Sequence, residues 1–385
     1  MKILHACKKY PQVQGGDAVV VANLERLQLR DGHQVVILTS NCAETERRNE
    51  VVRFGLKDSA EALDHISIRR LISLVMLAVQ AFRVFNRERP DVIHSHSVDM
   101  AFAVSFAARF YRIPIVHTFH IVTSREAVHG FVRNRAELRL LKAARTALVT
   151  ALNQTDLDHL SGIGVDVVLL PNGIDTSVWT PIALRPEQTR FAIVSVGRLE
   201  KHKGFPLLIE AAALLGDEVD VTIVGAGSLQ SQLQELIDRI KVSDRVRLAG
   251  SKTPAEIREL FARTDAMVIS SLYEAMPLAL LEAWASGLPV ITTEVGMVQT
   301  ADGGPARGVH LITDRDPATL AAAIQRLRGD RAYREALVKA GFEEVGQYTW
   351  KRVNASLSQH YQDIVASGAT AGRGRRLGRR RGGGV

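Results

Sequence analysis

Short runs of apolar, mostly β-branched residues alternate along the chain with longer stretches in which apolar residues recur at helical spacing. Continuous apolar runs of this length are typical of parallel strands that are buried on both faces. In the first half the predicted strands are Lys2–Ala6, Gln34–Thr39, Asp91–His94, Ile115–Thr118, Ala147–Ala151 and Val167–Leu170. In the second half they are Phe191–Val196, Val219–Val224, Val246–Leu248, Ala266–Ile269, Pro289–Thr292 and Val309–Ile312. This alternation predicts an α/β protein with two facing, Rossmann-like, doubly wound parallel-sheet domains.

The boundary between the two halves is predicted near the segment Pro171–Asp175, where Pro, Asn and Gly interrupt regular structure. We therefore expect a first domain over residues 1–174 and a second over residues 175–349. A helix over about 350–366 follows the last strand and could cross back to pack on the first domain. Ligands of such sheets bind beyond the carboxyl ends of the strands, so the cleft between the two domains is the expected site.

The net charge of +8 arises mostly from the C-terminal end of the chain. Six arginines lie there, at 373, 375, 376, 379, 380 and 381. Without them the basic residues number 43, against 41 acidic ones. Residues 367–385 are predicted to be a disordered Gly/Arg-rich tail, because they cannot bury apolar surface. The tail could touch RNA or an anionic membrane, or it could be a solvated extension; we expect no specific nucleic-acid binding.

A reducing cytoplasm is the expected location. The first residues lack the apolar stretch of a signal peptide, and two cysteines, Cys7 and Cys42, form neither a disulfide framework nor a zinc spacing. The longest apolar stretch, Leu71–Val79, is shorter than the roughly 20 residues that a membrane span needs. A buried helix is expected there, and a helix resting on the inner face of a membrane is the alternative.

The most informative segment for function runs from Ser271 to Val290, from a predicted strand through a loop into a helix. Pro277 suits the first turn of that helix, and the free amide of Leu278 would contribute to an anion site at the helix N-terminus. Glu274 lies in the loop and Glu282 within the helix. An ionised carboxylate accepts two hydroxyl hydrogen bonds at once, which suits a ribose diol.

Basic and glycine residues follow two other strands. Arg198 and Lys203 follow the strand Phe191–Val196, and a guanidinium with an ammonium suits a diphosphate. Gly16 follows the first strand and would let a backbone approach a phosphate or sugar closely. Neither this segment nor the one around Gly225 completes the G-x-G-x-x-G fingerprint, which argues against a dinucleotide-dependent oxidoreductase.

Histidines gather at two strand ends, where His94 and His96 precede His117 and His120. Such a set could bind a metal ion, so a metal-dependent hydrolase is an alternative function. Adjacent strand ends would also collect histidines simply by lining one cleft.

These motifs resemble those of the retaining GT-B glycosyltransferases of family 4, the glycogen-synthase-like and mannosyltransferase-like group. The resemblance extends from Gly16 to about Val365. Glu274 through Glu282 matches the family's E-x7-E motif, and Arg198 with Lys203 matches its basic pair. One departure follows that helix, where Gly296 stands alone in place of Gly-Gly-x-Pro-Glu.

The resemblance implies transfer of a hexose-type sugar, with retention, from a UDP- or GDP-sugar to a hydroxyl acceptor in polysaccharide, glycolipid or other glycoconjugate synthesis. The acceptor stays open, a lipid-linked one and a peripheral membrane contact included. No metal or other cofactor is implied. Glu274 and His120 would act at the transferred sugar, and Glu282 would bind the ribose. The other implied donor contacts are Gly16, Arg198, Lys203, Met276, Pro277 and Leu278. A nucleotide-sugar-binding protein without catalysis is a further alternative.

Overall fold

The computed structural model describes residues 1–8, 10, 16–40, 51–54, 68–120, 139, 144, 146–161, 164, 166–182, 189–298 and 307–377. The chain divides into two compact units: unit 1 is Met1–Leu170 with Lys351–Val385, and unit 2 is Pro171–Trp350. The division after residue 170 lies four residues before the predicted boundary at 174. Cys42, residues 11–15 and residues 378–385 lie outside the described part.

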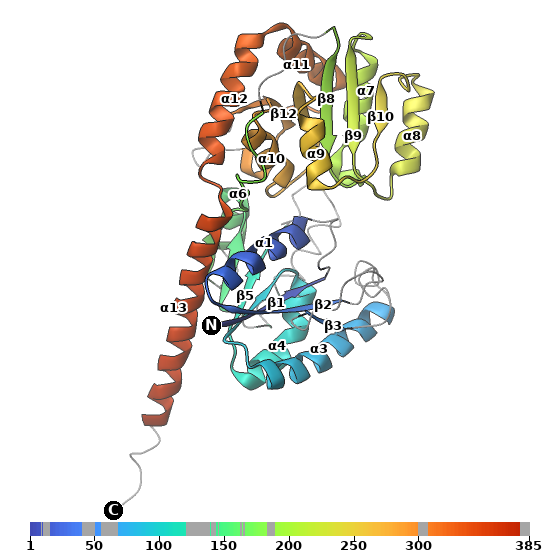
Figure 1. Ribbon diagram of the computed structural model, residues 1–385. Coiled ribbons are helices and arrows are strands. Elements are labelled where there is room, and N and C mark those ends of the chain that lie inside the picture. Colours follow the sequence, from blue (N-terminus) through green and yellow to red (C-terminus); the bar gives the residue numbers. More distant parts are fainter. Residues whose placement is uncertain are drawn as a thin grey trace, which may run out of the picture. The chain divides into compact units, whose positions relative to one another are not determined.

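Unit 1 is built on a parallel sheet of seven strands in the order β3-β2-β1-β4-β5-β6-β7 (Figure 1). The strands are β1 Lys2–Cys7, β2 Gln34–Ser40, β3 Val51–Phe54, β4 Val92–Ser95, β5 Ile115–Thr118, β6 Leu148–Ala151 and β7 Val167–Leu169. Its described helices are α1 Gly16–Arg30, α3 Ile68–Glu88, α4 Val98–Tyr111, α6 Gln154–Leu160 and α13 Trp350–Leu377.

Unit 2 is built on a parallel sheet of six strands in the order β10-β9-β8-β11-β12-β13 (Figure 1). The strands are β8 Phe191–Val196, β9 Val219–Val224, β10 Val246–Leu248, β11 Ala266–Ile269, β12 Val290–Thr293 and β13 Val309–Ile312. Its helices are α7 Phe205–Ala213, α8 Gln230–Arg239, α9 Pro254–Phe261, α10 Leu278–Ser286, α11 Pro317–Gly329 and α12 Arg331–Val345, with 3-10 turns η2 Lys201–Lys203 and η3 Gly296–Val298.

Both faces of each sheet are covered, which explains why the strands read as continuous apolar runs. In unit 1, Leu4 and Leu38 pack with α3 and α4, whereas Cys7 and Ile37 pack with α1 on the opposite face. The helix α13 belongs to this unit, where the Tyr361 hydroxyl lies 2.6 Å from His94 Nδ1. The predicted pair of doubly wound parallel sheets is therefore confirmed.

Two elements differ from the sequence-based expectation. The strand β3 was not predicted, because it is a four-residue edge strand whose short apolar pattern stands out little from its polar surroundings. The helix α13 continues to Leu377, whereas residues 367–385 were expected to be a disordered tail; Gly and Arg do not interrupt its helical backbone. None of the described helices is long and apolar enough to cross a membrane.

Candidate functional site

The predicted loop of Glu274 lies at the carboxyl edge of the unit 2 sheet, between the end of β11 and the start of α10. Glu274 is half-buried. Its carbonyl oxygen accepts a hydrogen bond of 2.9 Å from the amide of Gly296, at the start of η3. Gly296 is the single glycine at the point where the sequence departs from the family pattern. Its amide thus holds the backbone of the loop that carries Glu274, the predicted catalytic carboxylate.

Lys203 and Glu274, predicted for two different roles, are in direct contact. The Lys203 ammonium donates a short hydrogen bond to Glu274 Oε1 and forms an ion pair with it. The hydroxyl of Ser271 donates to the same oxygen at 2.7 Å. Glu274 Oε2 accepts no hydrogen bond from any described residue, so one carboxylate oxygen remains for a ligand hydroxyl.

A glycine makes this contact possible. Gly204 follows Lys203 with φ +62°, and a Cβ atom there would lie 2.1 Å from the carbonyl oxygen of Ser270. The Ser270 hydroxyl in turn donates to the carbonyl of Lys203 at 3.0 Å. Only glycine combines this backbone conformation with such a close approach, so Gly204 lets the β8 and β11 loops meet.

Glu282 lies within α10, half-buried, and no described side chain forms a hydrogen bond or ion pair with its carboxylate. Burial raises the pKa of Glu282 from 4.5 to about 7. A half-buried carboxylate without a partner is unfavourable in the folded chain, because the charged form loses hydration and gains no compensating bond. This is the behaviour expected of a group kept for a ligand.

The residues between the two glutamates shape the start of α10. Pro277 is the N-cap residue, one position before the first helical turn in which it was predicted. The amides of Leu278 and Ala279 have no acceptor among the described residues, as is usual for the first turn of a helix. Met276 is buried, and its sulfur and carbonyl oxygen accept hydrogen bonds from Asn172.

Arg198, the other half of the predicted basic pair, does not join the Lys203–Glu274 contact. It is exposed, and its guanidinium forms no hydrogen bond or ion pair with another described residue. The nearby Glu200 instead accepts two hydrogen bonds from Ser228, at 3.1 Å from its amide and 2.7 Å from its hydroxyl. These bonds hold the pKa of Glu200 below its ordinary value. The Arg198 guanidinium is thus left available to an anion.

Unit 1 carries the two remaining predicted residues. Gly16 is exposed at the first position of α1, and His120 is half-buried just beyond β5. His120 Nε2 lies 3.1 Å from His96 Nδ1. Burial lowers the pKa of His120, and the nearby Asp17 carboxylate opposes that effect. His120 is therefore neutral near pH 7.

The imidazole of His120 ends a chain of hydrogen bonds that the sequence did not predict. His96 Nε2 lies 3.0 Å from His5 Nδ1, and His5 Nε2 lies 2.8 Å from Gln28 Oε1. An amide oxygen only accepts, so His5 carries its proton on Nε2 and accepts at Nδ1. Burial lowers the pKa of His5 to about 4 and that of His96 well below 6.5, so both rings are neutral. His96 therefore donates from Nε2 to His5 and accepts at Nδ1. His120 donates to His96 Nδ1 and so carries its proton on Nε2.

The same histidines test the metal-site alternative. Ring nitrogens of His5, His94 and His96 lie within 4.8 Å of one another, a spacing that a metal ion could use. All six of these nitrogens already have hydrogen-bond partners, however, which for His94 are Thr118 and Tyr361. The described residues offer no carboxylate to this set. Hydrogen bonding accounts for the cluster without a metal.

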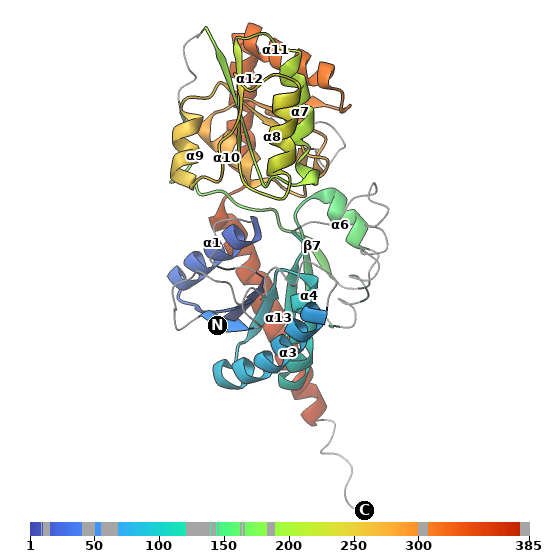
Figure 2. The same ribbon diagram turned by 90° about the vertical axis from the view of Figure 1, so that its right-hand side faces the viewer.

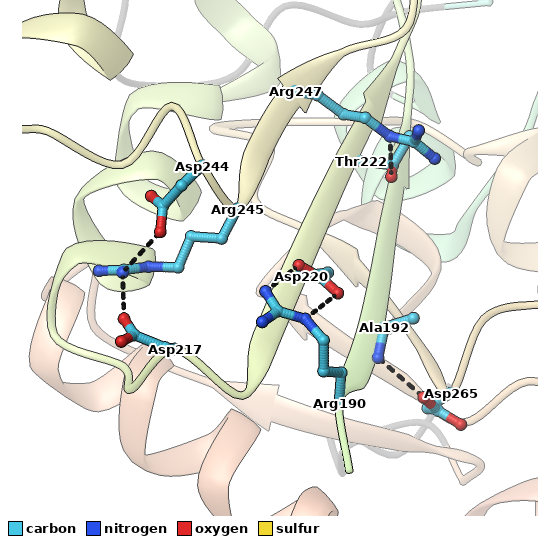
Figure 3. Close-up of polar contacts among 9 residues, drawn as sticks. All are labelled: Arg190, Ala192, Asp217, Asp220, Thr222, Asp244, Arg245, Arg247 and Asp265. Carbon is cyan, nitrogen blue, oxygen red and sulfur yellow. Dashed lines mark hydrogen bonds and ion pairs between the residues drawn. The ribbon is translucent and has the colours of Figure 1, made fainter. Parts of the chain in front are cut away.

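A second polar region of unit 2 lies at the opposite edge of the sheet, where the strands begin (Figure 3). It borders a groove of about 600 Å³. The Arg190 guanidinium binds both oxygens of Asp220, at 2.7 and 2.5 Å, and Arg245 pairs with Asp217 at 2.8 Å. None of the predicted site residues lines this groove.

Two family models match the chain in succession. The model described as Glycosyltransferase Family 4 matches residues 14–178, and the model described as Glycosyl transferases group 1 matches residues 181–344. Together they span most of both units.

Curated relatives extend over most of the chain. It is 28% identical to a glycogen synthase of Mycobacterium tuberculosis over 94% of each protein. It is 30% identical to a D-inositol 3-phosphate glycosyltransferase of Geodermatophilus obscurus, over 73% of this chain and 68% of that protein.

Solved structures share the fold. Sucrose-phosphate synthase from Thermosynechococcus elongatus has a TM-score of 0.81 at 20% identity, covering 95% of this chain and 100% of that one. HepE from Anabaena in complex with UDP-glucose has a TM-score of 0.75 at 18% identity, covering 94% and 100%.

Proposed function

The chain belongs to the family 4 glycosyltransferases of the GT-B fold, and from this premise we propose that it moves a hexose from a UDP- or GDP-sugar to a hydroxyl acceptor with retention of configuration. The observation that carries the proposal is the Lys203–Glu274–Ser271 cluster at the carboxyl edge of the unit 2 sheet. It places a cation and a carboxylate side by side, one suited to a diphosphate and the other to sugar hydroxyls.

In the proposed donor complex, the diphosphate lies against Lys203 and Arg198, with the free amides at the start of α10 as further donors. These groups stabilise the negative charge that grows on the leaving diphosphate. Glu282 accepts hydrogen bonds from the ribose hydroxyls, and Met276, Pro277 and Leu278 contact the nucleotide-sugar. The unpaired Glu282 carboxylate supports this assignment, because a ribose diol supplies the partners that the protein does not.

In the proposed transfer step, the bond between the anomeric carbon and the diphosphate breaks, and its electron pair leaves with the nucleotide. The acceptor oxygen bonds to the anomeric carbon and passes its proton to an oxygen of the departing diphosphate. Glu274 holds hydroxyls of the transferred sugar and stabilises positive charge at the reacting centre. His120 contacts the same sugar, and Gly16 approaches the donor phosphate or the acceptor.

The similar proteins support the donor class more than the acceptor. HepE is described in complex with UDP-glucose, which supports a UDP-sugar as the first donor to test. The relatives are named for glycogen and for D-inositol 3-phosphate, so a polysaccharide or another glycoconjugate stays open as acceptor. A cytoplasmic reaction with peripheral contact to the inner face of a membrane is also part of the proposal.

We further propose that transfer needs no metal ion. The hydrogen bonds of His5, His94 and His96 support this, because they account for every ring nitrogen of the cluster. A metal-dependent hydrolase predicts stoichiometric bound metal and loss of activity with chelator. A protein that only binds nucleotide-sugars predicts binding without turnover of the donor.

The test begins with a thermal-shift panel of nucleotide diphosphates and nucleotide-sugars, since a ligand of the folded state raises the melting temperature. The best donor is then assayed for turnover with and without chelator. We expect Glu274→Gln to nearly abolish turnover while donor binding stays measurable, and Lys203→Ala to weaken nucleotide diphosphate binding. Near-wild-type turnover of Glu274→Gln, or unchanged affinity of Lys203→Ala, would remove that residue from the site.

A further inference from the structure

Exposed apolar side chains of the described residues gather on one surface of unit 1. Of the eleven large apolar side chains that are exposed, seven belong to α3 and α4. We call this surface the α3–α4 face, which consists of Ile72, Val75, Met76, Val79, Phe82, Phe106 and Phe110. A concentration of this kind marks an interaction surface more often than single scattered residues do.

The helix α3 is apolar on two opposite sides, which is unusual for a helix at the surface of a soluble unit. Its inner side places Leu77, Ala81 and Phe85 in the core beneath the sheet. Its outer side leaves Val75 and Val79 about half exposed, at 56% and 50%. Folding of unit 1 buries only the inner side, so the outer side remains for a second apolar environment.

The helix α4 extends the same face. Both views show α3 and α4 side by side (Figures 1 and 2). The rings of Phe82 and Phe110 are 5.8 Å apart and join the exposed sides of the two helices, and Phe110 is 72% exposed. Phe106 lies one turn before Phe110 on α4 and is 55% exposed. The face is therefore continuous across both helices.

The described charged groups that border this face are positive. Arg83 on α3, Arg109 on α4 and Arg112 just after α4 are exposed, and none forms an ion pair with a described residue. The acids of these helices are engaged elsewhere: Glu88 pairs with Lys2 at 3.2 Å and Asp99 with Lys8 at 3.6 Å. Apolar side chains bordered by unpaired arginines match a bilayer that carries anionic headgroups.

We infer that the α3–α4 face docks unit 1 on an anionic lipid bilayer. The apolar side chains enter the boundary between headgroups and acyl chains, and the arginines bind lipid phosphates. A second copy of the chain fits this face less well. In a two-fold dimer the same surface meets itself, which would bring the unpaired arginines of both copies together.

The test is co-sedimentation of the full-length protein with vesicles of phosphatidylcholine alone and of phosphatidylcholine with phosphatidylglycerol. We expect stronger binding to the anionic vesicles. Val79→Glu with Phe110→Ser should weaken it at least about tenfold, because it removes apolar anchors and adds an acid. Arg83→Gln with Arg109→Gln should weaken it roughly thirtyfold at low salt, at about fivefold per lost arginine. Leu214→Glu, which changes an equally exposed apolar residue of unit 2, should bind as the wild type does.

Every variant keeps the arginine-rich C-terminal end, so its contribution to vesicle binding is the same throughout. Wild-type binding by both double variants would assign the lipid contact to another part of the chain and overturn the inference. So would failure of the wild type to bind anionic vesicles, or a loss of self-association instead of lipid binding in the apolar variant. The measurement does not use the transfer reaction, so its failure is distinct from a failure of the proposed function.

Discussion

Replacing Glu282 with glutamine should stabilise the empty protein near neutral pH and weaken its binding of the donor. The Glu282 carboxylate is half-buried without a partner, and its pKa is raised from 4.5 to about 7. In the unfolded chain the same group ionises at its ordinary pKa. Unfolding therefore releases a proton between these two values, and the folded state loses stability as the pH rises through that interval.

The size of the effect follows from the two pKa values. Each tenfold difference in proton affinity between folded and unfolded states corresponds to about 1.4 kcal/mol. The free energy of unfolding of the wild type should therefore be lower than that of a chain with a neutral residue at this position, by roughly 1 kcal/mol near pH 5 and roughly 3 kcal/mol near pH 8. Glutamine is neutral at every pH and close in shape. For a unit of this size, 2–3 kcal/mol corresponds to about 5–10 °C in melting temperature.

The assay is thermal unfolding of the wild type and Glu282→Gln near pH 5 and near pH 8, without donor. The control is Glu235→Gln, which changes an exposed glutamate on α8 of the same unit. Donor affinity is measured on the same samples by calorimetry near pH 8. Glu282→Gln should bind about tenfold to a hundredfold more weakly, the range expected when a charged hydrogen-bond acceptor is lost.

Two outcomes would refute this reasoning in different places. An equal shift in melting temperature at both pH values, or a lower melting temperature near pH 8, would show that no ionisation penalty resides at Glu282. A stabilised variant that binds the donor as tightly as the wild type does would keep the electrostatic account and remove Glu282 from the ribose site.

Two further predictions concern a glycine and an amide. Gly204→Ala should destabilise unit 2 in denaturant by clearly more than Gly250→Ala, because both have positive φ but only Gly204 would bring a Cβ atom to 2.1 Å from Ser270; equal losses would contradict the contact argument. Gln28→Leu removes the acceptor of His5, so His120 should no longer hold its proton on Nε2 alone, a change that nitrogen NMR detects. Gln28→Glu keeps an acceptor there and should leave the His120 tautomer as it is. An unchanged His120 tautomer in Gln28→Leu would mean that the chain of imidazoles does not determine it.

Much of the fold could be predicted from the sequence because strands buried on both faces leave an unbroken apolar signal. Val219–Val224 and Val246–Leu248 are predicted at the bounds that the structure gives. The edge strand β3 and the far end of α13 were not predicted correctly. Local composition predicts neither of them well. The strand β3 forms because it pairs with its neighbour β2, and the end of α13 forms because the preceding helix continues into it.

The candidate site could be predicted as a set of residues but not as an arrangement. Motif spacing identifies Lys203 and Glu274 separately, yet their contact depends on how closely the β8 and β11 loops approach at Gly204. The partners of His120 are harder still to predict, because His5 and Gln28 are distant in sequence from it. They meet only through the parallel register that sets His5 beside His94 and through the packing of α1.

The candidate site in unit 2 holds its charges in two different ways, and this difference bears on how a donor binds. Lys203 and Glu274 neutralise each other, so a bound diphosphate must attract the Lys203 ammonium while the Ser271 hydroxyl keeps its hydrogen bond to Glu274 Oε1. Glu282 has no such partner, and about half of its carboxyl groups carry a proton near pH 7. Hydrogen bonds from a ribose diol favour its ionised form, so binding should release that proton. Glu282 thus makes the protein without donor less stable above neutral pH, and the donor supplies the hydrogen bonds that its ionised form lacks.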